Sequence, residues 1–298
     1  MSILNQASDG LFNVLIVLAR TLVRVGARTR EELLQACGGD LAVVDVAMLN
    51  RTLTRWTDLG LFVSDDGKVT FAEPYGAELG RSVDVAEARL PKVVRRVALL
   101  PQNNARFWEA EGSKSADFCR GAAWVLAQDV YALNTKTEGL QALETAQFPN
   151  KAKAIVQNDT RWPGLRSWMG YLGLGRGGSP WCVDPTDALR QTLPEIFGGE
   201  RELPASAFLE RAARELPVLD GGSYRLEVEA VLKEAVWTPP REGLLSTSLS
   251  RALQRLDREG DIKLLQKSDI DAVSLCGLDQ RIWRDMSHVA LTARKAAR

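Results

Sequence analysis

Apolar residues recur with helical spacing through residues 10–59. Residues 10–25 predict a first helix that is buried on most sides. Thr29 and Glu32 form a T-x-x-E capping box, which predicts a short second helix ending before Gly38. Asp40 is then expected to cap a third helix that runs to Leu59, with Leu, Val and Trp side chains along its buried face.

Two short alternating runs follow this third helix. In LFVSDDGKVTFAE, apolar and polar residues alternate on both sides of Asp66–Gly67, a dipeptide that favours a tight hairpin turn. Three helices followed by a hairpin are the element order of a winged helix-turn-helix. The pattern therefore predicts such a domain over residues 1–78.

The same pattern recurs near the C-terminus. MLNRTLTRWTDLGLF (48–62) aligns without a gap on SLSRALQRLDREGDI (248–262). Helical spacing over 207–217 and 224–236 precedes this second copy, and residues 262–276 are expected to form a hairpin around a turn at Lys267–Ser268–Asp269. Two unrelated amphipathic helices are the alternative, but a hairpin in the same place favours a second winged helix over residues 204–298.

The chain between these copies, residues 79–203, is predicted to be a helical middle domain. Helical spacing covers residues 89–100, 115–133 and 137–148. The Gly-, Pro- and Trp-rich segment 160–197 is expected to fold through turns before one helix near Thr186–Leu193. The expected fold class is thus mainly α, with tandem winged helix-turn-helix domains flanking a helical middle domain.

Composition narrows the chemistry. The 298 residues contain one His and four widely separated Cys, so they hold no HExxH zinc motif and no CxxC pair. We therefore expect no metal, no cofactor and no enzymatic activity. The 38 basic and 38 acidic residues cancel, but residues 1–80 carry net −3, residues 81–180 net +5 and residues 181–298 net −2. The basic residues of the C-terminal tail are Arg281, Arg284, Arg294, Lys295 and Arg298.

The N-terminal sequence shows no targeting signal. MSILNQASDG lacks a basic segment, and the apolar run Leu11–Leu18 is too short to span a membrane. A cytoplasmic protein without a membrane partner is therefore expected.

Arginines on the exposed faces of the two third helices are the main binding candidates. In a winged helix this face enters the major groove, where Arg contacts guanine edges or phosphates. Lysines at the two wing turns are expected to contact the DNA backbone. The candidate DNA-binding residues are Arg51, Arg55, Lys68, Arg251, Arg255, Arg258 and Lys267, with Asn50, Thr54 and Gln254 as further base contacts.

A solvated or protein-binding helix face is the alternative for these arginines. The acidic N-terminal segment favours that alternative there, because a domain that binds duplex DNA alone is usually basic. DNA contact is therefore expected to concentrate away from the N-terminal domain.

Three further motifs favour structural roles. Gly173–Gly178 fits GxGxxG, but it lacks the preceding strand and following helix of a dinucleotide site. Asp285, Ser287 and His288 lie within one predicted helix and therefore cannot assemble as a catalytic triad. Tryptophans interleaved with Arg can stack on unpaired bases, but a core role is favoured for Trp124, Trp162, Trp168 and Trp181.

Three stretches of the sequence resemble the DpdG family. They are ILNQASDGLFNVLIVLARTL, NDTRWPGLRSWMGYLGLG with VDPTDALRQTLPEIF, and RIWRDMSHVAL. The resemblance implies a bacterial accessory protein of the gene cluster that inserts 7-deazaguanine derivatives into DNA and restricts unmodified DNA. It implies DNA and helicase-like and nuclease-like subunits as partners, and it transfers no catalytic residue.

The resulting expectation is a non-catalytic DNA-binding or adaptor subunit of a DNA-modification or anti-phage restriction complex. One alternative is a protein–protein scaffold whose winged helices bind partner subunits. Another is a winged-helix transcription regulator, which would act as a homodimer with two-fold-related recognition helices.

Overall fold

The computed structural model describes residues 3–4, 12–109, 114–150, 153–156, 161–178, 180–267 and 272–292. The predicted mainly α class is confirmed, since the strands in these residues form only small sheets of two or three strands. The chain divides into two compact units, Met1–Phe118 with Thr160–Leu172 and Cys119–Asp159 with Gly173–Arg298. The division into domains 1–78, 79–203 and 204–298 stays a prediction.

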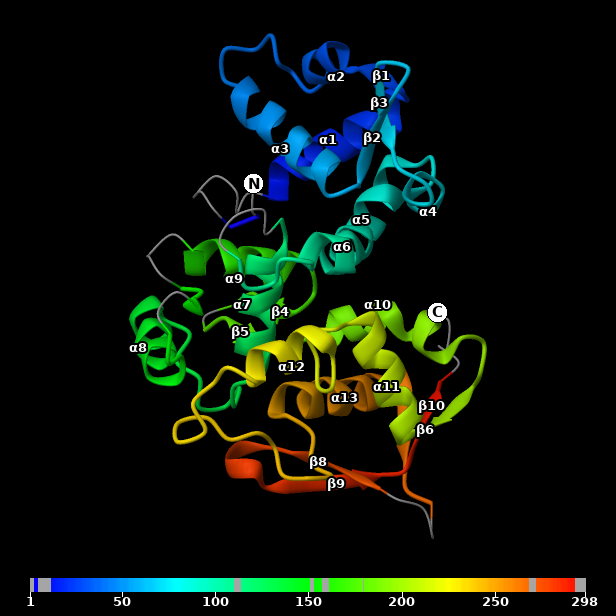
Figure 1. The fold of residues 1–298 in the computed structure, drawn as a ribbon. Coiled ribbons are helices and arrows are strands. Elements are labelled where there is room, and N and C mark those ends of the chain that lie inside the picture. Colours follow the sequence, from blue (N-terminus) through cyan, green and yellow to red (C-terminus); the bar gives the residue numbers. More distant parts are fainter. Residues whose placement is uncertain are drawn as a thin grey trace. The chain divides into compact units, whose positions relative to one another are not determined.

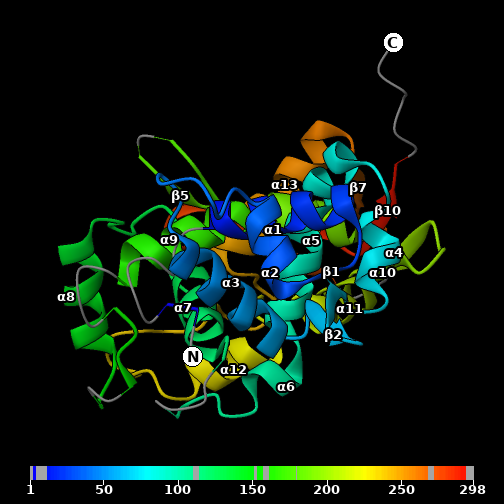
Figure 2. The same cartoon turned by 90° about the horizontal axis from the view of Figure 1, so that it is seen from above.

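Three helices and a three-stranded sheet open the first unit. Seen from above, α1 runs beside α3 and α5 (Figure 2). The sheet has the order β1-β3-β2, with β3 antiparallel to both neighbours. The elements are α1 Phe12–Val25, β1 Arg28–Thr29, α2 Arg30–Ala36, α3 Val46–Asp58, β2 Phe62–Asp65, β3 Lys68–Phe71, α4 Tyr75–Leu79, α5 Val83–Leu99, α6 Pro101–Asn104 and α9 Arg161–Tyr171.

The local signals of this region form as predicted, apart from one helix start. Thr29 Oγ1 accepts a hydrogen bond from the Glu32 amide at 3.3 Å, and Glu32 Oε2 accepts one from the Thr29 amide at 3.0 Å. The hydrogen bond from the Thr29 amide, followed by the Thr29 side chain, favours the carboxylate and lowers the pKa of Glu32 below its usual range. The Asp66–Gly67 hairpin is confirmed. The predicted cap at Asp40 is wrong, because Asp45 accepts the Met48 amide at 2.9 Å and α3 begins at Val46.

Helix α9 forms where only turns were expected. Pro163 lies in the first turn of this helix, where a missing backbone N–H removes no intrahelical bond. The indole of Trp168 packs on Trp56, with ring centroids 5.6 Å apart, and on Phe12, at 6.1 Å. Aromatic burial therefore stabilises a helix that its Gly and Pro content argues against.

The second unit repeats a similar order of elements with insertions. Figure 1 shows α13 between α10 and β8, and α13 contacts both of these elements and also β7. Its three-stranded sheet has the order β6-β10-β7. Helix α7, Ala116–Leu126, begins in the first unit and continues into the second. The other elements are α8 Thr137–Gln147, β4 Gly175–Arg176, β5 Cys182–Val183, α10 Thr186–Phe197, β6 Glu202–Pro204, α11 Ala205–Glu215, α12 Ser223–Glu229, α13 Thr247–Glu259, β7 Ile262–Leu265, β8 Val273–Cys276, β9 Ile282–Met286 and β10 His288–Leu291.

Two predictions for the end of the chain are wrong. Strand β7 pairs with β10, and β8 pairs with β9, so β7 and β8 do not form the expected hairpin. His288 lies in a strand and not in a helix. The reason is burial, since Val289 is fully buried in the central strand and pairs with Leu264 and Leu203. Residues 268–269 of the predicted turn, and Arg294, Lys295 and Arg298 of the basic tail, lie outside the described residues.

Other helices and the cysteines refine the expectations. The helix predicted over 224–236 ends at Glu229, and the one predicted over 115–133 ends at Leu126. The four cysteines are free, with Cys119 and Cys276 buried and Cys37 and Cys182 partly exposed. Across the described part of the chain, no helix combines the length and apolarity needed to cross a membrane.

The position of β10 predicts unequal effects of two truncations on the same strand. Val289→Ala removes methyl groups from a fully buried site and should lower the free energy of unfolding by about 2 kcal/mol. Leu291→Ala, at a side chain that is 40% exposed, should cost clearly less although it removes more carbon. Urea unfolding of both variants measures the difference, and an equal or reversed loss would contradict this strand placement.

Candidate nucleic-acid interface

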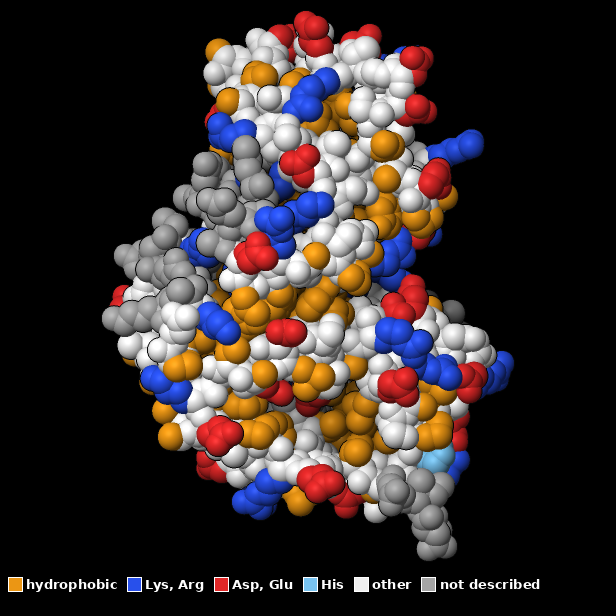
Figure 3. Space-filling view, in the orientation of Figure 1, with side chains coloured by type: hydrophobic (Ala, Val, Ile, Leu, Met, Phe, Trp, Pro, Cys, Tyr) orange, Lys and Arg blue, Asp and Glu red, His pale blue; other side chains and the backbone are white. Residues whose placement is uncertain are grey.

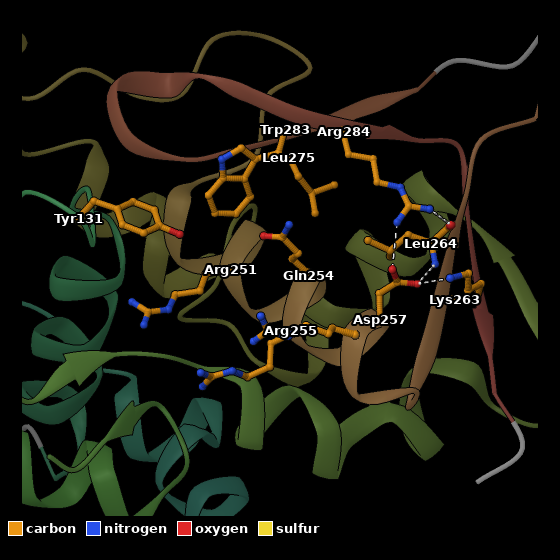
Figure 4. A pocket seen from close by; sticks show the side chains of 11 residues that line it. Tyr131, Arg251, Gln254, Arg255, Asp257, Lys263, Leu264, Leu275, Trp283 and Arg284 are labelled. Carbon is orange, nitrogen blue, oxygen red and sulfur yellow. Dashed lines mark hydrogen bonds and ion pairs between the residues drawn. The ribbon is translucent and has the colours of Figure 1, made fainter. Parts of the chain in front are cut away.

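A hollow of about 600 Å³ lies in the second unit beside the outer face of α13 (Figure 4). Helix α13 supplies one wall, β7 and the β8–β9 hairpin supply others, and Tyr131 closes one end. Two aromatic residues, Tyr131 and Trp283, line it. Five cationic side chains also line it, namely Arg251, Arg255, Arg258, Lys263 and Arg284.

The sequence of α13 explains why this face points outward. Leu249, Leu253 and Leu256 are buried on the opposite side of the helix. Ser246 caps the first turn by accepting the Leu249 amide at 3.2 Å. Asp220 holds this cap, because it accepts the amide and the hydroxyl of Ser246, each at 2.6 Å. The helix start and its rotation are therefore fixed.

Asp257 organises one end of the hollow. Its carboxylate accepts the Leu264 amide at 3.0 Å and pairs with Arg284 Nη1 at 2.9 Å and Lys263 Nζ at 3.4 Å. Figure 4 shows these groups converging on the carboxylate, which joins the end of α13 to β7 and β9. One carboxylate faces two cations here, so the net charge of this end of the hollow is positive.

Arg255 lines the hollow, but its guanidinium is already paired with carboxylates of the protein. Its guanidinium pairs with Asp184, whose side chain has no exposed surface, and lies 3.7 Å from Glu259. Asp184 also accepts the Thr186 amide at 3.1 Å and lies 3.6 Å from Arg176 Nε. A fully buried carboxylate needs such partners. Arg255 therefore acts on the site by positioning α13.

Arg251 and Arg258 are the cations best placed for an anion. The Arg251 guanidinium lies 5.8 Å from the centre of the Tyr131 ring. Arg258 is exposed, and within the described ranges its side chain has neither an ion pair nor a hydrogen bond. Two guanidinium groups without a carboxylate partner can therefore contact phosphate oxygens directly.

Tyr131 and Trp283 form the aromatic edge of the hollow. Their ring centroids are 5.8 Å apart, and the planes meet at 75°. Tyr131 is 40% exposed and Trp283 is 36% exposed, so both rings keep accessible surface. Partial burial raises the pKa of Tyr131, which keeps its phenol neutral at physiological pH. The exposed end of Gln254 lies near Trp283 in Figure 4.

The N-terminal third helix does not offer the predicted face. Arg55 is only 6% exposed, so the prediction that it lies on the exposed face of the helix is wrong. The buried stripe of α3 is wider than predicted, because it also takes in Thr52. Arg51 lies 4.0 Å from Asp45. Arg30 binds the side chains of Asn50, at 2.6 Å, and Thr54.

The two wing lysines do not line the hollow. Lys68 is exposed at the first position of β3, beside the Asp66–Gly67 turn. Lys267 follows β7, where its amide donates to Ser287 Oγ at 2.8 Å and its ammonium pairs with Glu202. This pair also lowers the pKa of the Glu202 carboxyl.

The remaining motifs take structural positions. Ser287 Oγ lies 3.1 Å from His288 Nδ1, but Asp285 accepts a hydrogen bond from Ser274 at 2.5 Å, so it does not orient the imidazole. Gly175 lies in β4 and pairs with Val183 of β5. The carbonyl of Gly173 accepts a hydrogen bond from the Ala188 amide in the first turn of α10 at 2.9 Å, so the glycine-rich segment packs on this helix start itself. The four central tryptophans are all buried, which agrees with their core role (Trp124, Trp162, Trp168 and Trp181).

Sequence reasoning identified three of the arginines that line the hollow and missed its aromatic edge. Trp283 stands between two arginines in RIWRDM, a signal that the local sequence did contain. Tyr131 lies far away in the chain, and no local pattern links it to α13. Arg284 was assigned to a basic tail, and Lys263 was not singled out.

Comparison with protein families gives a match over most of the chain. A family model described as DpdG-like matches residues 1–270. No curated protein and no solved structure matches the chain.

The burial of Asp184 predicts a large cost for removing its charge. Asp184→Asn leaves the Arg255 guanidinium without its buried partner and should cost about 3–5 kcal/mol of unfolding free energy. Asp187→Asn is the matched control. Asp187 also pairs with two arginines, Arg190 and Arg176, but its side chain is 44% exposed, so this substitution should cost about 1 kcal/mol or less. Denaturant titration compares the free energies of unfolding of the two variants. A similar loss in both would show that the buried charge of Asp184 is no more important for stability than the exposed charge of Asp187.

Proposed function

The chain belongs to the DpdG-like family, and we propose that it is a non-catalytic DNA-binding subunit of the system that inserts 7-deazaguanine derivatives into DNA and restricts unmodified DNA. In this role it acts in the bacterial cytoplasm with the other subunits of that system. The observation that carries the proposal is the cation-lined hollow on α13, where Arg251 and Arg258 have no carboxylate partner.

We infer that each unit contains a winged helix-turn-helix. In the first unit, α1, β1, α2, α3, β2 and β3 occur in the expected order, and β3 lies at the centre of the sheet. In the second unit, α10, β6, α11, α13, β7 and β10 occur in the same order, and β10 lies at the centre. Helix α12 and the β8–β9 hairpin are then insertions. The third helix, which is the usual nucleic-acid contact of this fold, is α3 in one unit and α13 in the other.

The charges favour α13 over α3 as the DNA contact. Arg30 holds the side chains of Asn50 and Thr54 on α3. Arg55 is buried, and residues 1–80 carry a net charge of −3. The outer face of α13 instead borders five cations and one carboxylate. Phosphate neutralisation supplies most of the affinity of non-specific DNA binding, so the more cationic helix is the better candidate.

The non-catalytic role rests on the chemistry of the chain. Its single His, His288, lies on a strand beside Ser287 without the carboxylate that a triad requires. Cys276 is poorly suited to act as a nucleophile, because its thiol donates a hydrogen bond to the Leu245 carbonyl at 3.0 Å and burial raises its pKa. These groups support binding rather than covalent chemistry.

The salt dependence of DNA binding tests this function. Fluorescence anisotropy with a labelled oligonucleotide should give an affinity that falls linearly with the logarithm of salt concentration. The double variant Arg251→Ala with Arg258→Ala should reduce that slope by about 2, since each lost phosphate contact removes about 0.9. Arg214→Ala, an exposed arginine at the end of α11, is the matched control and should change nothing.

Two results would count against DNA binding through α13. One is the absence of binding at low salt, where electrostatic contacts are strongest. The other is a slope that the double variant leaves equal to that of Arg214→Ala.

A second function, docking of a partner protein on the first unit, is favoured by one surface. Leu41 is 56% exposed, Val43 is 92% exposed and Val46 is 38% exposed, all at the entry to α3. Figure 3 shows hydrophobic side chains at the surface over this end of the first unit. Clustered exposed apolar residues are typical of interaction sites. In this scaffold function the first unit binds another subunit of the same system.

Charge substitution separates this docking from DNA binding. Val43→Asp should abolish co-purification with a co-expressed subunit of the system and leave DNA affinity unchanged. Val236→Asp, at a valine of the second unit that is 47% exposed, is the control and should preserve the complex. Equal co-purification of both variants would remove the scaffold function from this surface.

A further inference from the structure

The hollow on α13 is enclosed in a way that an open recognition helix is not. The β8–β9 hairpin and Tyr131 border the same face that carries Arg251 and Arg258. A helix that enters a major groove has to stand clear of its neighbours over that face. A volume of about 600 Å³ lies instead within the usual range of a site for one small molecule.

Trp283 is held in position by the turn that precedes it. Gly277 lies directly against the Trp283 ring, so closely that a side chain at this glycine would collide with the indole. The turn is closed by the Gly277 amide, which donates to the Arg281 carbonyl at 2.9 Å, and by the Arg281 amide, which donates to Leu278 at 3.1 Å. The ring is therefore positioned before any ligand binds, which lowers the entropic cost of binding.

The aromatic and cationic groups of the hollow match two parts of one ligand. An indole face can stack on any of the nucleobases. Arginines such as Arg251 and Arg258 can pair with the backbone phosphates of the same nucleic acid. Within a paired duplex both faces of each base are already covered by neighbouring base pairs. A base can thus reach Trp283 only when it is unpaired and unstacked.

We propose that this hollow binds a nucleotide of DNA whose base is unpaired, with the base against Trp283 and Tyr131 and the phosphates at Arg251 and Arg258. The proposal rests on the DNA-binding function proposed above and specifies the form of DNA that α13 receives. An unpaired base can come from a single strand or from a nucleotide extruded from a duplex. The chemistry at the hollow is the same for both.

Binding of four related DNAs to the full-length protein tests the proposal. The probes have one sequence of about 12 nucleotides, within the site size of single-strand binders. They are the single strand, its complete duplex, the duplex with one central mismatch, and a strand with the same phosphates but abasic sites. We expect the single strand to bind at least about ten-fold more tightly than both the complete duplex and the abasic strand. Tight binding of the mismatched duplex would assign the ligand to an extruded nucleotide.

Substitutions at Trp283 provide a second readout. Trp283→Leu should weaken single-strand binding about 5- to 150-fold without changing the salt slope, while Trp283→Phe should keep most of the affinity. Ile282→Ala, at the neighbouring residue of β9, is the control, because Ile282 is 61% exposed and does not line the hollow.

The outcomes separate this proposal from the DNA-binding function itself. If the complete duplex or the abasic strand binds as tightly as the intact single strand, the unpaired-base proposal is overturned, whereas loss of binding in the arginine double variant would still support DNA binding by α13. If no probe binds, both proposals are overturned. The abasic strand gives its answer with the unmodified protein, so this test does not depend on how any variant folds.

Discussion

The buried carboxylate of Asp184 is the constraint on which the geometry of the second unit depends. Its side chain has no exposed surface, and it meets the Thr186 amide at the start of α10, Arg176 of β4 and Arg255 of α13. A buried charge is tolerated only with such compensation. The carboxylate therefore links three elements and fixes the rotation of α13. That rotation places Arg251 and Arg258 on the face that lines the hollow, while the guanidinium of Arg255, which also borders the hollow, is paired with Asp184.

The two units have a similar order of elements, but the surfaces beside their third helices, α3 and α13, differ. In the first, Arg30 occupies the polar side of α3, and exposed apolar residues gather at the start of this helix. In the second, the inserted β8–β9 hairpin brings Trp283 and Arg284 beside α13. The neutral total charge of the chain thus conceals a division between one helix with its polar groups internally bonded and another bordered by cations. This division supports a subunit that meets DNA with one unit and protein with the other.

The sequence predicted the features that depend on neighbouring residues. The Thr29 capping box and the Asp66–Gly67 turn are local, and each forms as predicted. Helical spacing is also local, and it located the helices but not all of their ends. The pairing of β7 with β10 is not local, because an inserted hairpin separates the two strands. Helix α9 depends on the burial of Trp168 against Trp56, which overrides the influence of Gly and Pro. Arg55 was predicted to be exposed because the helical spacing of apolar residues shows where a buried face is centred but not how wide it is. In α3 the buried face extends to Thr52 and Arg55. The family resemblance is confirmed by a match over residues 1–270.

Hydrogen–deuterium exchange of the full-length protein with and without single-stranded DNA tests the central claim most directly. Exchange of backbone amides reports which segments a ligand covers or stabilises. The account predicts slower exchange on DNA addition in peptides that contain Tyr131, α13 and β9, with no change in α3. Protection of α3 without protection of α13 and β9 would contradict it.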